Sequence, residues 1–173
     1  MGLHKRNIFI FVLALIGIGL AGCTMGFGEK TEGTYDDLLQ QVFTVSPEQR
    51  ELAEYSTDAL IGSLVIENAT YSILSSDETK IELEVTAPDM RTLFSYLLDF
   101  DADMTDPHAE YDRIAANIIA SLERGAPTVT NIVVVGIEQI DGQPSLIMCD
   151  EFLDAMYGGM ISFFHELMEM GNQ

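Results

Sequence analysis

The chain has 173 residues, with 28 acidic side chains against 8 basic ones and a formal net charge of -20 at pH 7. This charge argues against a nucleic-acid partner, because affinity for phosphate backbones is built from Lys and Arg side chains. It also disfavours contact with anionic membrane surfaces, and the partners it attracts are cations and basic proteins.

The N-terminal segment has the pattern of a secretion signal. His4, Lys5 and Arg6 precede an apolar run over residues 8–21, which is shorter than the roughly 20 residues that a helix needs to cross a bilayer. A short apolar run with a small-residue end is typical of a signal peptide. The segment Leu20-Ala21-Gly22-Cys23 resembles the lipobox of bacterial lipoproteins. The resemblance implies that residues 1–22 are removed and that Cys23 carries a diacylglycerol.

The lipobox interpretation sets the domain boundaries. Residues 23–33, rich in Gly and Thr, are predicted to form a flexible tether, and residues 34–173 a single domain. Two or more acyl chains hold a protein stably on a bilayer, so we expect a lipid-anchored protein on the extracytoplasmic face of the cell membrane. Cys149 is then the one cysteine left, which predicts no intrachain disulfide. Its apolar surroundings favour a small buried side chain without chemistry.

The first part of the domain is predicted to be helical. A short helix is expected over residues 35–43, and Ser46 followed by Pro47 and Gln49 is typical of a helix start. We expect this second helix to continue to Gly62. The β-branched and aromatic residues of 64–74 then predict a strand.

The middle of the chain gives stronger signals. Residues 80–86 alternate strictly between apolar and polar, which predicts a strand with one solvated face, joined to the previous strand by a turn over 75–79. Thr86 and Asp89 are spaced as a capping signal for a helix that begins near Met90. Asp106 and Pro107 open another helix, which is expected to stop at residues 125–127.

The last third is predicted to contain a second hairpin and two helices. Residues 129–140 and 144–149 flank the turn dipeptide Asp141-Gly142. Asp150 is expected to cap a short helix that ends before Gly158-Gly159. A helix over 160–170 has little polar circumference, which suits burial on two sides or an interface in a homodimer.

This order of elements predicts an α+β fold, in which an antiparallel sheet of about four strands, in two hairpins, packs against helices. The order, the segment Val85-Thr86-Ala87-Pro88-Asp89 and the closing segment 150–159 resemble small uncharacterised lipoproteins of Gram-positive type. The resemblance covers roughly residues 34–160. It implies a cystatin-like or nuclear-transport-factor-like, cone-shaped domain, and it implies fold more than function.

A calcium site is one candidate for chemistry. Residues 99–110 carry Asp99, Asp101, Asp103 and Glu110 at EF-hand spacing, and calcium prefers such oxygen ligands. Met104 stands where an EF-hand loop needs glycine for its sharp turn. The alternative is that Asp106 caps the following helix, Glu110 favours its N-terminal dipole and the preceding acids are solvated.

Catalytic motifs are weak. His165-Glu166 begins a zinc-protease pattern, but Glu169 stands where the second His belongs. The sequence has no nucleophile-elbow motif and no glycine-rich phosphate loop. We therefore expect a non-catalytic, lipid-anchored binding or accessory domain without a resident cofactor. The alternatives are an enzyme that uses a pocket carboxylate in a cone-like fold and a calcium-binding domain.

Overall fold

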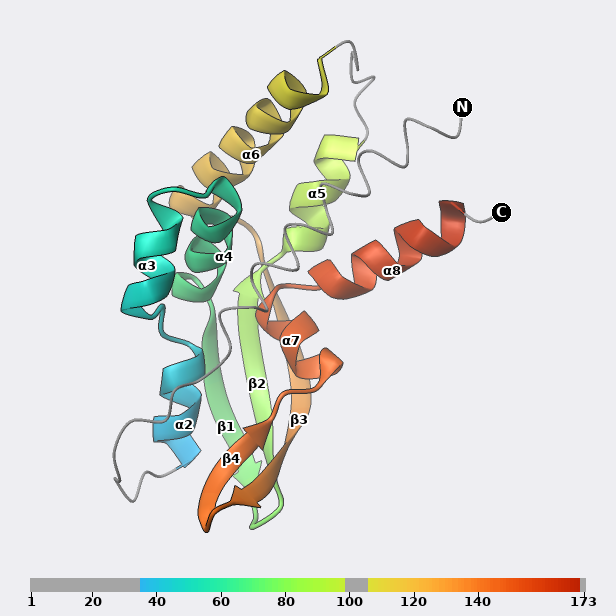
Figure 1. Ribbon diagram of the computed structural model, residues 1–173. Coiled ribbons are helices and arrows are strands. Elements are labelled where there is room, and N and C mark those ends of the chain that lie inside the picture. Colours follow the sequence, from blue (N-terminus) through green and yellow to red (C-terminus); the bar gives the residue numbers. More distant parts are fainter. Residues whose placement is uncertain (1–34, 99–105, 172–173) are drawn as a thin grey trace.

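The computed structural model describes residues 35–98 and 106–171. They form an α+β domain in which a four-stranded antiparallel sheet in the order β1-β2-β3-β4 packs against helices, as predicted (Figure 1). The elements are α2 (Tyr35–Val42), α3 (Pro47–Ala53), α4 (Thr57–Glu67), β1 (Thr70–Ser76), β2 (Lys80–Pro88), α5 (Met90–Leu98), α6 (Pro107–Glu123), β3 (Thr128–Ile140), β4 (Gln143–Ile147), α7 (Asp150–Met156) and α8 (Met160–Gly171). Helices within these two ranges all fall short of the length and hydropathy that a bilayer crossing requires.

The sheet has one covered face, which we call the inner face. Ile81, Leu83 and Val85 of β2 point into it and have no exposed surface. The register places Leu83 opposite Val133 and Ile81 opposite Val135 of β3. This confirms that the alternation of residues 80–86 marks a strand with one buried side. Helix α7 packs over β2 and β3 on this face, and α4 also contacts β2 (Figure 1).

The helices that lie beyond the end of the sheet extend the core. In Figure 1, α5, α6 and α8 stand above the strands. Ala115, Ile118 and Leu122 of α6 are buried and α6 packs against α4. Asp106 accepts hydrogen bonds from the backbone amides of His108 and Ala109, so it is the N-cap that the sequence predicts for α6.

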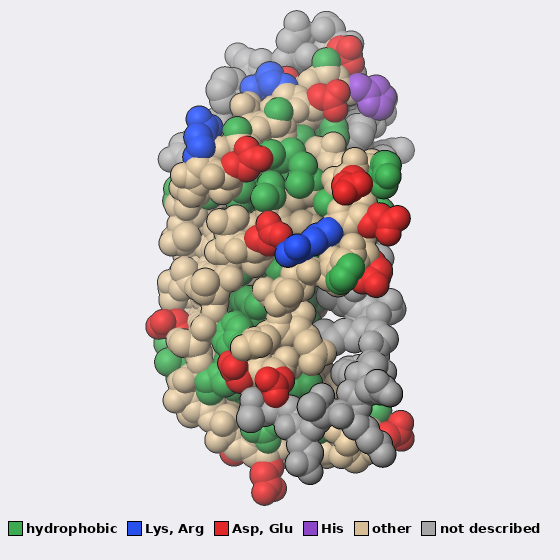
Figure 2. Space-filling model, turned by 90° about the vertical axis from the view of Figure 1, so that its left-hand side faces the viewer, with side chains coloured by type: hydrophobic (Ala, Val, Ile, Leu, Met, Phe, Trp, Pro, Cys, Tyr) green, Lys and Arg blue, Asp and Glu red, His purple; other side chains and the backbone are tan. Residues whose placement is uncertain are grey.

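One surface of the helical layer is shown in Figure 2, which views the molecule from the side of α2, α3 and α4. Acidic side chains are spread from the top to the bottom of this face, whereas the few basic ones lie apart from one another between its top and its middle (Figure 2). Arg50 of α3 pairs with Glu67 of α4 across 3.6 Å. Both are well exposed, so the pair adds little to stability. Tyr55, 82% exposed, lies in the turn between these two helices.

Tyr71 ties the N-terminal helix to β1. Its hydroxyl donates to the carboxylate of Asp36 in α2 at 2.9 Å. Partial burial of the phenol, together with this hydrogen bond, raises the pKa of Tyr71 to about 12. The neutral phenol therefore helps to hold α2 against the sheet at neutral pH.

The second predicted helix is wrong in its extent. Ser46 and Gln49 form the expected capping box, but α3 ends at Ala53, and Ser56 accepts a hydrogen bond from the Ala59 amide to start α4. Gly62 lies inside α4, and β1 begins at Thr70 rather than near residue 64. The β-branched residues Val65 and Ile66 favour strands, yet both are helical and buried in α4. Burial against other elements overrides their local preference.

Two predicted caps are also corrected. Thr86 lies in β2, where its hydroxyl bonds to that of Thr130, and Asp89 itself caps α5 by accepting from the Thr92 amide at 2.9 Å. Cys149 holds the N-cap position of α7 without a side-chain hydrogen bond, so Asp150 is the first residue of that helix rather than its cap. Cys149 is partly buried and packs against the core.

Candidate functional site

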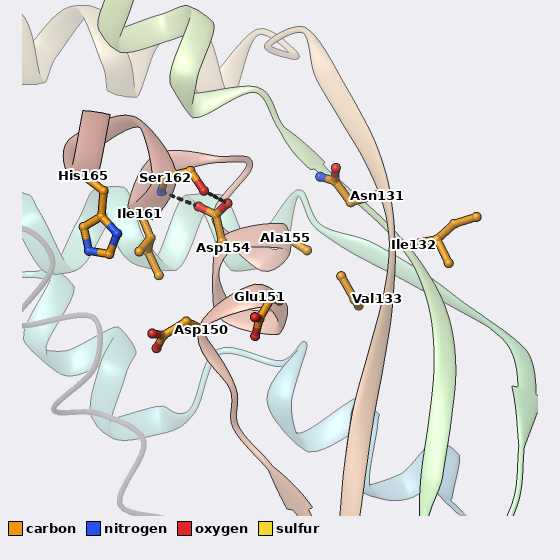
Figure 3. A pocket seen from close by; sticks show the side chains of 10 residues that line it. All are labelled: Asn131, Ile132, Val133, Asp150, Glu151, Asp154, Ala155, Ile161, Ser162 and His165. Carbon is orange, nitrogen blue, oxygen red and sulfur yellow. Dashed lines mark hydrogen bonds between the residues drawn. The ribbon is translucent and has the colours of Figure 1, made fainter. Parts of the chain in front are cut away.

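A hollow lies between β3, α7 and the start of α8. It has a volume of about 320 Å³ and is lined by ten residues from these three elements. Figure 3 shows them: Asn131, Ile132, Val133, Asp150, Glu151, Asp154, Ala155, Ile161, Ser162 and His165. We refer to this hollow as the groove.

Helix α7 supplies the acidic wall of the groove. Phe152, Ala155 and Met156 are buried on one side of this helix. Asp150 and Glu151, in its first turn, are exposed. The packing of the apolar side against the sheet therefore fixes the direction in which the carboxylates project.

A tight turn brings α8 back beside α7. Gly158 and Gly159 adopt φ angles of +57° and +79°, which L side chains rarely take. A Cβ on Gly158 would lie 1.7 Å from the carbonyl oxygen of Pro88. This glycine therefore lets the turn approach the end of β2 closely. The turn places Ile161, Ser162 and His165 of α8 on the groove.

Asp154 stabilises this arrangement. Its carboxylate accepts from the amide of Ser162 at 2.9 Å and from the Ser162 hydroxyl at 2.5 Å, which Figure 3 shows as dashed lines. Both of its oxygens are engaged by the first turn of α8. Asp154 is thus a structural carboxylate, whereas Asp150 and Glu151 stand at the exposed rim.

The opposite wall of the groove is an open sheet edge. Strand β4 pairs only with residues Gly136–Ile140 of β3, although β3 begins at Thr128. The Ile137 amide donates towards β2, to the carbonyl of Thr79 at 2.7 Å. Because backbone groups alternate in an antiparallel ladder, those of Ile132 and Val134 point the other way, to the side where the described chain provides no strand.

The side chains of this edge alternate between two environments. In Figure 3, Asn131 and Val133 lie on the side of β3 that faces α7, and Ile132 points away from it. Ile132 is 63% exposed and Val134 is 53% exposed. Both lie on the outer face of the sheet, where Ile132 is opposite Glu84 of β2. The edge therefore combines backbone groups that have no strand partner in residues 35–98 and 106–171 with an apolar outer side.

The charge of the groove has one sign. Three of its ten lining residues are acidic, one is His165, and none is Lys or Arg. A concave surface with charges of one sign concentrates counter-ions and oppositely charged ligands. Among the described residues, no group of three or more His, Cys, Asp or Glu side chains is placed to hold a metal ion. The groove can therefore attract positive charge next to backbone donors and acceptors that the described part of the chain leaves unpaired.

The predicted calcium ligands are not brought into this groove. Asp99, Asp101 and Asp103 lie outside the described residues. Glu110 lies in the first turn of α6, where its carboxylate accepts from the guanidinium of Arg113, and this hydrogen bond lowers the pKa of Glu110. Asp106 caps α6, which agrees with the alternative stated for this segment. The calcium site stays a prediction.

The other predicted candidates lie apart from one another. His165 lines the groove, but Glu166 points elsewhere and pairs with Arg91 of α5. Among the described residues, Ser63 is the one buried polar side chain, so no carboxylate there is both buried and beside a cavity. The enzyme alternative therefore gains no support from this part of the chain.

The apolar side of helix α8 packs against α5 of the same chain. Phe163 and Phe164 are buried, and the ring of Phe94 in α5 stacks on Phe163 with centroids 6.4 Å apart and meets Phe164 edge-on at 5.3 Å. The helix is thus buried on one side, while Ser162, His165 and Glu166 on its other side are exposed. The homodimer through residues 160–170 stays a prediction.

Sequence reasoning did not identify the groove. The signal was present in the lengths of the two predicted strands, since 129–140 is about twice as long as 144–149, and the longer strand of a hairpin must extend beyond its partner. The spacing of Asp150, Glu151 and Asp154 on a short helix was a second signal. What the sequence did not supply was the turn that folds α8 back beside them.

Comparisons of the chain with protein families, with curated proteins and with solved structures find no match.

Proposed function

We propose that this chain is a lipid-anchored binding or accessory domain on the extracytoplasmic face of a membrane, and that its groove receives a positively charged partner. The observation that carries the binding role is the groove itself, which Asp150 and Glu151 line together with residues of a strand edge that β4 leaves uncovered. The anchor rests on the lipobox-like segment that ends at Cys23.

The two parts of the proposal support each other. A chain of net charge -20 gains nothing from contact with an anionic membrane surface, so acyl chains at Cys23 are the means of attachment that fits its charge. A lipid at the N-terminus leaves the folded domain facing the surrounding medium. The groove is then accessible to proteins or peptides that carry Lys and Arg.

The anchor is tested by labelling with an alkyne analogue of palmitate in a bacterial host that produces the full chain. We expect label on the wild-type protein in the membrane fraction and none on the C23A variant. The matched control is C149A, which removes the other cysteine and should keep the label. Label that persists on C23A, or an unlabelled wild-type protein that retains Met1, would refute the anchor.

The binding role is tested with an octalysine peptide and the detergent-solubilised protein in isothermal titration calorimetry. Reversing two rim charges, D150K with E151K, should weaken binding about tenfold or more, because close like charges repel by an amount of that order. The control pair E54K with E123K changes the net charge equally at exposed positions elsewhere. Equal weakening in both pairs would mean that octalysine senses the overall charge rather than the groove.

A further inference from the structure

The open edge of β3 and the acidic wall beside it define a more specific partner. We propose that the edge at residues 130–134 accepts an extended segment of a basic protein as an additional strand, in the position that β4 leaves vacant. This inference rests on the proposed function, since it names the chemical class of partner that the groove binds.

The geometry of the edge favours an added strand. Beyond the last pair, Gly136 with Ile147, the chain leaves the sheet through Met148 and Cys149 and enters α7. The next strand position along β3 is thus vacated, and the groove of about 320 Å³ occupies the space between the edge and α7. The backbone groups of Ile132 and Val134 point to this vacated side of β3, and Ile132 is also a lining residue of the groove. A peptide that pairs with them gains main-chain hydrogen bonds without any rearrangement of the sheet.

The two sides of the edge differ in chemical character. An added strand would place alternate side chains on opposite faces. Those on the inner side would enter the groove, whose lining holds three acidic side chains and no Lys or Arg, which favours Lys or Arg in the partner. Those on the outer side would lie next to Ile132, which is 63% exposed and favours apolar neighbours. The expected segment therefore alternates between basic and apolar residues.

Charge also favours a basic segment over a second copy of this chain as the partner of the β3 edge. A second copy of this chain could pair its own β3 edge with this one, but that arrangement would bring two sets of Asp150, Glu151 and Asp154 close together. Like charges across an interface are costly. A basic segment instead neutralises them, and it suits a chain whose net charge is -20.

The orientation follows from the same geometry. In antiparallel pairing, the residue opposite Ile132 shares its outer face and directs its own N–H towards β3. For a peptide in which Lys alternates with Val, this residue is a Val. The N–H groups of the lysines then point away from β3 to solvent. N-methylation on the valines and N-methylation on the lysines should thus have different effects.

The experiment compares synthetic eight-residue peptides that bind the detergent-solubilised protein. The alternating Lys-Val peptide should bind, and methylation of its Val amides should weaken binding about tenfold or more, because the lost hydrogen bonds leave backbone acceptors on β3 unpaired. Methylation of its Lys amides should leave the affinity within about twofold. The two methylated peptides share composition and charge, so each is the control for the other. A loss on Lys methylation alone would also support strand addition, in the parallel orientation.

Hydrogen exchange supplies a readout on the protein itself. The alternating peptide should slow exchange of the Ile132 and Val134 amides about tenfold or more and leave the exposed Glu123 amide region unchanged. The D150K, E151K pair should abolish this protection, whereas E54K, E123K should retain it.

Three results would overturn the inference. The first is equal affinity for both methylated peptides. The second is that binding does not slow hydrogen exchange at Ile132 and Val134. The third is slow exchange of those amides in the free protein together with a doubled mass in analytical ultracentrifugation, which would assign the edge to a second copy. Octalysine that binds through Asp150 and Glu151, while the methylated peptides bind equally, would leave the proposed function intact and remove strand addition alone.

Discussion

The inner face of β2 and the outer face of β3 have similar residues and opposite surroundings. Ile81, Leu83 and Val85 on the inner face of β2 have no exposed surface, whereas Ile132 and Val134 on the outer face of β3 are 63% and 53% exposed. The two strands are neighbours with a continuous register. Apolar alternation alone therefore does not tell which side of a sheet forms the core.

The difference arises from where the chain goes after β4. The residues that follow Ile147 cross to the inner side, and α7 then covers β2 and β3 there. This path closes the inner face, and among the described residues it leaves the outer side of β3 uncovered and the β3 edge before Gly136 without a strand neighbour. An exposed strand edge with apolar side chains is a ready site for another strand. The molecule thus has a closed region that holds it together and an open region that is available to a partner.

The strongest test of the closed region is the turn between α7 and α8. In G158A the new Cβ would collide with the Pro88 carbonyl and the backbone would be strained at positive φ. We expect a loss of about 5 kcal/mol in the free energy of unfolding, measured by urea denaturation. The control is G142A in the β3-β4 turn, where φ is +78° and nothing lies near the added Cβ. Its cost should be about 1 kcal/mol, and equal losses would refute the close-approach argument.

The two faces of the sheet are compared directly by truncating one apolar side chain on each. L83A should lower the free energy of unfolding by about 3 kcal/mol, because it opens a cavity where the side chain is fully buried. I132A should cost less than about 0.5 kcal/mol, since an exposed side chain loses little contact. Chemical denaturation of both variants measures the difference. Comparable losses would mean that the outer face is covered by part of the same molecule.

The smallest expected effect tests whether Asp154, unlike Asp150 at the rim of the groove, stabilises the fold. D154A removes the acceptor for the Ser162 amide and hydroxyl, and we expect a loss of about 1 kcal/mol in thermal or urea denaturation. D150A should change stability by less than about 0.5 kcal/mol, because the exposed Asp150 is not the cap of α7. If D150A were the more destabilising variant, our division of the groove acids would be wrong.

Several elements could be predicted because their signals are local. The Asp106-Pro107 start of α6 depends on side-chain capping within one turn. The Asp141-Gly142 turn depends on residues that tolerate positive φ, which are +53° and +78° in the structure. The strict alternation over residues 80–86 likewise needs no knowledge of distant residues. Hydrogen bonding and backbone sterics within a few residues decide all three.

The boundary between α4 and β1 could not be predicted in this way. Residues 64–74 contain β-branched and aromatic side chains that favour a strand, yet Val65 and Ile66 complete a buried helix. The packing of α4 against α6 and β2 fixes that choice, and those neighbours are distant in sequence. The N-cap role of Ser56 was a local signal that competed with a longer apolar pattern.

The sequence by itself determined the acidic character of this protein, the lipobox-like segment at Cys23, most of the helices and the two hairpins, because composition and short-range stereochemistry suffice for each. Only the tertiary structure decided which face of the sheet is covered, which edge of β3 stays open, and which acids of α7 stand beside it. Those properties depend on the path of the chain after β4 and on the close approach of Gly158 to Pro88. They join residues that lie far apart in the sequence, and local preferences carry no information about such contacts.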